Sequence, residues 1–219
     1  MVQSLGASAI TLRDLIDRVQ LQELRDQAAR EFFPEWHQSL PDLTEADRQA
    51  LDKIRAGYFN LLQSPPLLER SVQFSVVAPL LFWADLYLPP FQLRCEESVS
   101  YTTPDGNTQI RGDLDAMILR DRVWLLIIES KQAHVSVEAG LAQLLAYLLA
   151  QTHPELPSYG LVTTGGHFLF VKLLQRPNQP PCFATSDEFT LRTTQGNALY
   201  RVFQILKKLT QTPPIPGIS

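Results

Sequence analysis

The sequence predicts an α/β fold: a mixed central sheet of the restriction-endonuclease-like kind, flanked by helices and preceded by extra N-terminal helices. Apolar residues recur at helical spacing in the first third of the chain, and the pattern becomes strand-like after Pro89-Pro90. A further helical pattern then separates the later strands. This order predicts helices packed on the faces of a mixed sheet.

Two helices are expected in residues 1–66, which we interpret as an N-terminal helical elaboration. Apolar residues at near-helical spacing from Leu12 to about Phe33, with charges between them, predict one surface helix. Thr44 followed by Asp47 resembles a capping box and predicts the start of the second. Ser64-Pro65-Pro66 is expected to end it.

The predicted core, residues 67–210, opens with a third helix from Leu67 to about Leu86. This segment is apolar on most faces, which predicts burial, and Pro79 is expected to kink or shorten the helix. A loose tail is expected at residues 211–219, where prolines cluster.

Five strands and two more helices are predicted in the core. The strands are Phe91 to Thr102, Ile110 to Leu119, Arg122 to Glu129, Tyr159 to Thr164 and His167 to Leu174, and the helices are Ser136 to Gln151 and Gly196 to Leu209. Residues 103–107 and Gly165-Gly166 predict hairpin turns. The unbroken apolar run of residues 123–128 predicts a central strand, and no clear element is predicted for residues 177–192.

Composition fits one globular domain: 219 residues, 45% hydrophobic and 19% charged. Two cysteines offer no disulfide framework, and no stretch reaches the length of a membrane span, so a cytoplasmic protein without a membrane partner is expected. A formal charge of −4 is unlike that of most nucleic-acid binders. Metal-dependent nucleases, however, collect carboxylates that the cation neutralises.

The chemistry is expected between residues 111 and 132. The two-residue period of a strand puts Glu129 and Lys131 on one face, and a hairpin brings Asp113 or Asp115 of the preceding strand near them. Charges at the end of a buried strand need a partner, and a hard cation such as Mg²⁺ accepts carboxylate ligands. Lys131 is then expected to hold or deprotonate the attacking water.

At these residues the sequence resembles the PD-(D/E)XK nuclease superfamily, as Asp115 followed by Glu129-Ser130-Lys131. It looks most like the N-terminal nuclease domain of type I restriction enzyme subunits. Gln143 and Tyr147 fit the Q-x-x-x-Y signature of RecB-like members, and Glu69 lies where the family often carries a helical acid. The resemblance covers roughly residues 67–174. It implies a DNA endonuclease that hydrolyses phosphodiester bonds with Mg²⁺ or Mn²⁺.

The resemblance also assigns roles. Asp115 and Glu129 would bind the metal, with Asp113 and Glu69 as further candidate ligands, Lys131 would act on water, and Gln143 with Tyr147 would support the site. Leu114 stands where the family name has proline. A chain of this length has no room for a motor, so target choice is expected from a separate targeting or motor subunit, and a homodimer is compatible with cutting both strands.

Each of these residues also has a plainer interpretation. The plainer interpretation of Glu129 and Lys131 is a surface ion pair at a strand end. Gln143 and Tyr147 are helix neighbours that can pack together, and acids such as Glu69 are ordinary in a first helical turn. Asp113 and Asp115 both remain candidates. The rival functions are a nucleic-acid-binding or assembly module without useful turnover, and a protein-interaction domain built on the N-terminal helices.

Overall fold

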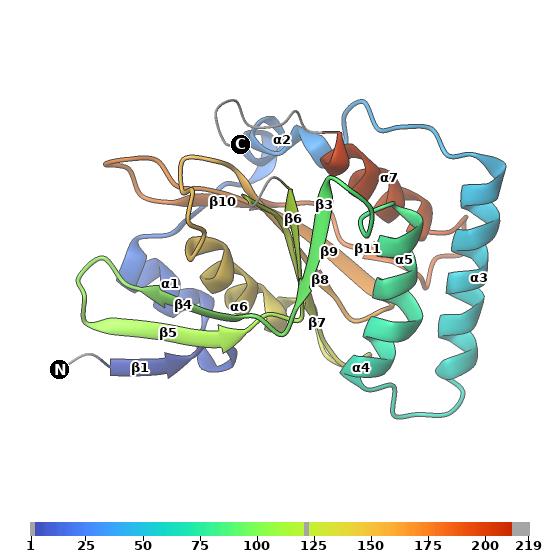
Figure 1. Ribbon diagram of the computed structural model, residues 1–219, viewed down its shortest axis with the longest axis horizontal. Helices are drawn as coiled ribbons and strands as arrows, with labels where there is room; N and C mark the ends of the chain where they lie inside the picture. The colour runs from blue at the N-terminus through green and yellow to red at the C-terminus, as the bar shows by residue number, and fades with distance from the viewer. Residues whose placement is uncertain (1–2, 121–122, 212–219) are drawn as a thin grey trace.

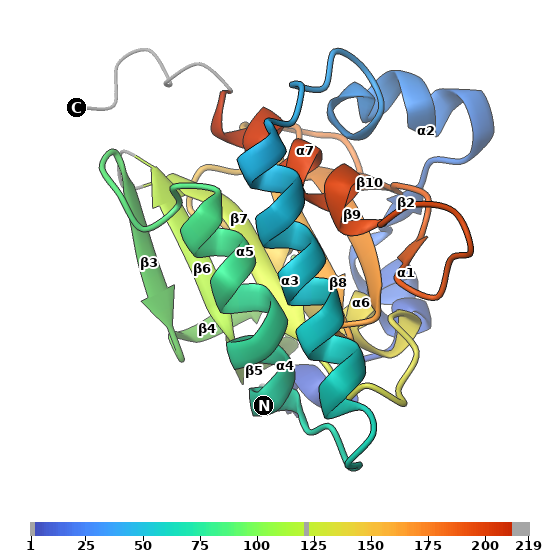
Figure 2. The same cartoon turned by 90° about the vertical axis from the view of Figure 1, so that its right-hand side faces the viewer.

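The protein is a layered α/β structure (Figure 1). The computed structural model describes residues 3–120 and 123–211. Within these ranges, a mixed eight-stranded sheet forms the centre and a three-stranded sheet lies beside it. Helices cover both faces of the large sheet, as the second view shows (Figure 2). The predicted α/β class and the mixed sheet flanked by helices are therefore confirmed.

The strands fall into two sheets. They are β1 (Gln3–Gly6), β2 (Gln22–Glu23), β3 (Phe91–Cys95), β4 (Ser98–Thr102), β5 (Thr108–Asp113), β6 (Ala116–Arg120), β7 (Val123–Ser130), β8 (Ser158–Thr163), β9 (His167–Leu174), β10 (Cys182–Thr185) and β11 (Phe189–Thr190). The large sheet has the order β2-β10-β9-β8-β7-β6-β3, with β11 also paired to β9, and the small sheet has the order β1-β5-β4. Strands β7 and β8 are parallel and are joined through a helix, whereas β6 and β7 are antiparallel.

The helical segments occupy distinct layers. They are α1 (Leu12–Val19), α2 (Asp26–Phe32), α3 (Glu45–Leu61), α4 (Glu69–Val72), the π segment η3 (Gln73–Val77), α5 (Ala78–Trp83), α6 (Glu138–Leu149) and α7 (Leu199–Thr210), with the 3₁₀ turns η1 (Ala7–Ala9) and η2 (Pro34–Trp36). Figure 2 shows α3 and α5 in front of the large sheet, with α6 behind it.

Strand β7 separates two hydrophobic cores. Ile128 packs in the core beneath α3, α5 and α7, whereas Ile127 packs in the core shared with α1 and α6. The alternation of side chains along a strand places these neighbours on opposite faces. Residues 126–130 are all buried, so the predicted central strand is confirmed.

The N-terminal residues belong to both cores. Leu15 of α1 lies in one core, and Leu51 and Tyr58 of α3 lie in the other. The predicted capping box of α3 is present, because Asp47 N–H donates to Thr44 Oγ1 (3.1 Å) and Thr44 N–H donates to Asp47 Oδ2 (2.8 Å).

The single helix predicted from Leu12 to Phe33 is wrong. Gln20 adopts the left-handed region at φ 56° and ends α1, after which β2 pairs with β10 before α2 begins. Leu21, which lies between α1 and β2 along the chain, is buried. A tertiary strand pairing therefore replaces the local helical preference here.

The third predicted helix is interrupted and only partly buried. Pro79 lies in the first turn of α5, directly after the π segment η3. Proline has no backbone N–H to donate, and the change in helix type before it accommodates this missing hydrogen bond. Val76 and Leu80 face the core, but Phe74 and Phe82 are 75% and 63% exposed. The expectation of a buried helix is therefore wrong for one of its faces.

Two of the predicted strands are each divided into two shorter strands, which belong to different sheets. Residues 91–102 divide into β3 and β4 at Glu96, which has φ 56°, and residues 110–119 divide into β5 and β6 at Leu114 and Asp115. The chain therefore passes from the large sheet to the small one and back. The predicted turn at residues 103–107 is confirmed, since it joins β4 to β5, and Gly106 has φ 69° there.

The later part of the fold follows the prediction closely. Strands β8 and β9 form the expected hairpin around Gly165, which has φ 80°. Residues 177–192, for which no clear element was predicted, contain β10 and β11. The expectations for residues 121, 122 and 212–219 lie outside the described residues. Within the described part of the chain, no helix has the length and apolar content needed to cross a bilayer.

Candidate metal centre

Three carboxylates from three separate elements converge at one end of β7. Glu69 begins α4, Asp115 lies between β5 and β6, and Glu129 is the second-last residue of β7. Ligand atoms of all three lie within 4.8 Å of one another, and this is a cluster of acids that can hold a metal ion. Like charges at this spacing repel, so the cluster favours a bound cation or a bound proton.

Strand register and one loop contact fix the positions of these acids. Ala116 is paired with Ile128, which places Asp115 beside the end of β7, where its Oδ2 accepts a hydrogen bond from the Ser130 N–H (2.5 Å). The N–H of Ala133, just after β7, donates to the carbonyl of Leu67 (3.2 Å). This contact holds the start of α4 against the same strand end.

Glu129 is the most buried member of the cluster, with 1% of its surface exposed. Burial, followed by the nearby negative charge of Asp115, raises the pKa of Glu129 to about 8. Its Oε2 is buried and has no hydrogen-bond partner among the described residues. Burial and the charge of Asp115 also raise the pKa of Glu69.

Lys131 turns its ammonium group into the site. Its Nζ donates to Glu129 Oε1 (2.5 Å) and to Gln143 Oε1 (2.9 Å), and its side chain is 18% exposed. Both partners lie on the α6 side of the sheet. A lysine held by two fixed acceptors keeps a defined position, unlike the mobile lysines of an exposed surface.

A directional hydrogen-bond chain continues from this lysine. Gln143 Nε2 donates to the Tyr147 hydroxyl (2.8 Å), which donates to the carbonyl of Asp113 (3.1 Å). Lysine has only donors, so the Gln143 oxygen must face it and the amide nitrogen must face Tyr147. Burial raises the pKa of Tyr147 to about 12, which keeps this hydroxyl a donor at neutral pH.

The side chain of Asp113 is not part of the carboxylate cluster. It lies on β5, where its Oδ1 accepts a hydrogen bond from Ser98 Oγ (2.6 Å). The expectation that Asp113 and Asp115 belong to one strand is wrong, because the chain changes sheets between them. The structure thus brings together Glu69, Asp115, Glu129 and Lys131, with Gln143 and Tyr147 behind them.

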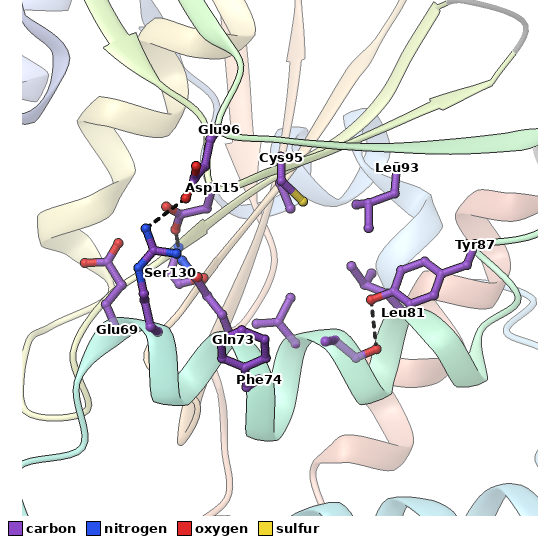
Figure 3. Close-up of a pocket in the computed structure, with 14 residues that line it drawn as sticks. Glu69, Gln73, Phe74, Leu81, Tyr87, Leu93, Cys95, Glu96, Asp115 and Ser130 are labelled. Atoms are coloured by element: carbon purple, nitrogen blue, oxygen red, sulfur yellow. Dashed lines mark hydrogen bonds and ion pairs between the residues drawn. The ribbon is translucent and has the colours of Figure 1, made fainter.

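A pocket that the sequence pattern did not reveal opens beside the cluster (Figure 3). It has a volume of about 480 Å³ and is lined by Glu69, Arg70, Gln73, Phe74, Val77, Ala78, Leu81, Tyr87, Leu93, Cys95, Glu96, Asp115, Ala116 and Ser130. Its walls come from the α4–α5 segment and from β3, β6 and β7. Contacts between elements so distant in sequence leave no local pattern to find.

The arrangement suits an oxygen-liganded cation with a fixed ammonium group beside it. No model of a known protein family matches this chain, and its sequence matches no curated protein.

Proposed function

We propose that this chain is a metal-dependent phosphodiesterase that hydrolyses DNA as an endonuclease, on a restriction-endonuclease-like version of the mixed sheet. One observation carries the proposal. Glu69, Asp115 and Glu129 approach within 4.8 Å, beside a lysine that donates to one of them. The antiparallel β6–β7 pair and the helix that joins parallel β7 and β8 present these groups from rigid elements.

The residues present fit a hard divalent cation. All three candidate ligands offer oxygen, the donor that Mg²⁺ and Mn²⁺ take. The buried Glu129 Oε2, which has no hydrogen-bond partner among the described residues, is the kind of atom that a cation satisfies. Glu69, Asp115 and Glu129 would hold the ion. When bound, it would stabilise the charge that develops on the scissile phosphate and acidify a water molecule.

Lys131 is the residue that acts on the attacking water in this proposal. Its Nζ, held by Glu129 and Gln143, would orient the attacking water and stabilise negative charge at the phosphate. Tyr147 acts on Gln143 and so is a positioning residue. DNA as the partner, a separate targeting or motor subunit and a homodimer are part of the same proposal.

The deciding experiment measures metal binding and cleavage separately. We expect Mn²⁺ to raise the melting temperature of the parent chain. At a hundredfold excess of Mn²⁺ over Kd, the free energy of unfolding should rise by about 2.7 kcal/mol, and Glu129→Ala should abolish this stabilisation. Plasmid and single-stranded DNA should be cleaved in Mn²⁺ by the parent and at least about a hundredfold more slowly by Lys131→Ala.

Lys53→Ala is the matched control, because Lys53 is an exposed lysine of α3. It should cleave as fast as the parent. Equal cleavage by Lys131→Ala and the parent would mean that the activity belongs to a contaminant. A stabilising Mn²⁺ shift without cleavage would favour the rival reading, a nucleic-acid-binding module on the same fold.

A further inference from the structure

The pocket beside the carboxylates differs in character between its two ends. Glu69, Asp115 and Ser130 lie at one end, and Leu81, Leu93 and Tyr87 lie at the other (Figure 3). A volume of about 480 Å³ lies within the range of small-molecule sites. In the proposed nuclease, the phosphate of the substrate would lie at the carboxylates. The part of the substrate next to that phosphate would then enter the pocket, and apolar faces would suit its walls.

Most of the polar side chains lie near the carboxylate end, whereas the Tyr87 hydroxyl, at the other end, donates to the Ala78 carbonyl (3.2 Å; Figure 3). Ser130 is fully buried and lines the pocket, and its Oγ has no hydrogen-bond partner among the described residues. Gln73 adds an amide, with both donors and an acceptor. Apolar walls with a few hydrogen-bonding groups at one end match a nucleobase, which has apolar faces and a polar edge.

Phe74 supplies a flat apolar surface at the pocket wall. Its side chain is 75% exposed and lines the pocket. Stacking of a base on an exposed aromatic ring contributes binding energy without regard to sequence.

The charges at the pocket offer little attraction to phosphates. Among the described lining residues the charged ones are Glu69, Glu96, Asp115 and Arg70, so three are acidic and one is basic. Arg70 is itself paired with Glu96 (2.8 Å). Duplex binders and single-strand binders both attract phosphates with lysine and arginine, and single-strand binders add base stacking, so binding in this pocket would rest on stacking.

We propose that this pocket binds the unpaired base of a single-stranded DNA substrate, next to the phosphate that is cut. The proposal rests on the proposed function, because it uses the carboxylate cluster as the place of the phosphate. In a duplex, pairing and stacking cover the base, so an unpaired nucleotide enters the pocket at lower cost.

Binding without cleavage tests this directly. Fluorescence anisotropy in Ca²⁺, a hard cation with the same oxygen ligands, would compare four labelled probes of one sequence: single-stranded DNA, the same strand with abasic sites, its duplex, and single-stranded RNA. The parent chain should bind single-stranded DNA at least about tenfold more tightly than the abasic strand or the duplex.

Phe74→Ala should weaken single-strand binding about tenfold, and Phe74→Trp, which keeps an aromatic ring at this position, should bind single strands as tightly as the parent. Phe82→Ala is the matched control, because Phe82 is also an exposed phenylalanine (63%), lies on α5, and does not line this pocket. It should bind like the parent. Both positions are exposed, so neither substitution is expected to unfold the chain.

The outcomes separate the two proposals. Equal affinity for intact and abasic strands, duplex binding as tight as single-strand binding, or equal losses for Phe74→Ala and Phe82→Ala would overturn the base pocket. Retained Mn²⁺ stabilisation in the same samples would then leave the nuclease proposal standing. RNA bound as tightly as DNA would support the pocket and extend the substrate class to both.

Discussion

Glu129 illustrates at the scale of one residue how a candidate site lowers stability. Its pKa is raised from 4.5 to about 8 by burial and by the charge of Asp115. Between these values the folded chain keeps a proton that the unfolded chain has lost, so the free energy of unfolding falls as pH rises. Below pH 4.5 both states are protonated and this loss disappears.

Glu129→Gln removes the ionisation and should therefore stabilise the metal-free protein. We expect its free energy of unfolding to exceed that of the parent by about 1–3 kcal/mol at pH 8, with a much smaller gain at pH 5. Urea unfolding in EDTA at both pH values measures this. Glu31→Gln, at an exposed position of α2, should show no such difference. A gain at pH 8 no larger than at pH 5 contradicts the prediction.

Side-chain patterns predicted much of the candidate site. The two-residue period correctly placed Glu129 and Lys131 together, and the i, i+4 spacing of Gln143 and Tyr147 correctly made them neighbours. The sequence favours Asp115 over Asp113 because Asp115 adjoins the apolar run. The structure has Asp115 and not Asp113 in the carboxylate cluster, because the chain changes sheets between them. The approach of Glu69 depends on how α4 packs, which no local pattern encodes.

At the scale of elements, α6 packs closely on β8 through Gly160. A Cβ built there would lie 2.6 Å from Leu144 Cδ2, so the glycine is needed for this close approach. Gly160→Ala should lower the free energy of unfolding by about 1–3 kcal/mol, because an overpacked core must shift. Thermal or urea unfolding would show it.

The control for that substitution has the opposite sign. Gly57 is an exposed position of α3, and a Cβ added there meets nothing within 4 Å. Gly57→Ala should raise the free energy of unfolding by about 0.5–1 kcal/mol, through helix propensity. If both alanines shift stability in the same direction, the packing explanation for Gly160 is wrong.

Elements that begin or end at a local sequence signal, such as a capping box or a turn glycine, were predicted well. Elements that depend on pairing with distant segments were not. The capping box at Thr44 and the glycines at 165 and 166 mark α3 and the β8–β9 hairpin directly. The change of sheet at Glu96, a non-glycine residue with positive φ, carries no such mark. Strand β10 was missed for a related reason, because its four residues depend on pairing with β2 and β9.

At the scale of the whole molecule, residues before position 67 complete both cores. Leu15 packs with α6, and Leu51 and Tyr58 pack with the opposite core. A chain that begins at residue 67 should therefore show no cooperative urea transition, since it loses these side chains together with β1 and β2. Circular dichroism during urea titration measures this.

A shorter truncation is the control for that experiment. Strand β1 lies at the edge of the small sheet and is largely exposed, so removal of residues 1–5 should preserve a cooperative transition. Cooperative unfolding of the chain that begins at residue 67, at a stability near that of the parent, would show that the N-terminal segment is dispensable.

The connection at Leu114 and Asp115 gives the three acids unequal supports. Glu129 is carried by the large sheet and Glu69 by a helix packed on it, whereas Asp115 hangs between β5 of one sheet and β6 of the other. A tilt of the small sheet would pull on Asp115 against its hydrogen bond from the Ser130 N–H, and would leave Glu69 and Glu129 in place. The spacing of the three acids therefore depends on how the two sheets are seated, and a molecule bound to the small sheet would alter the proposed cation site.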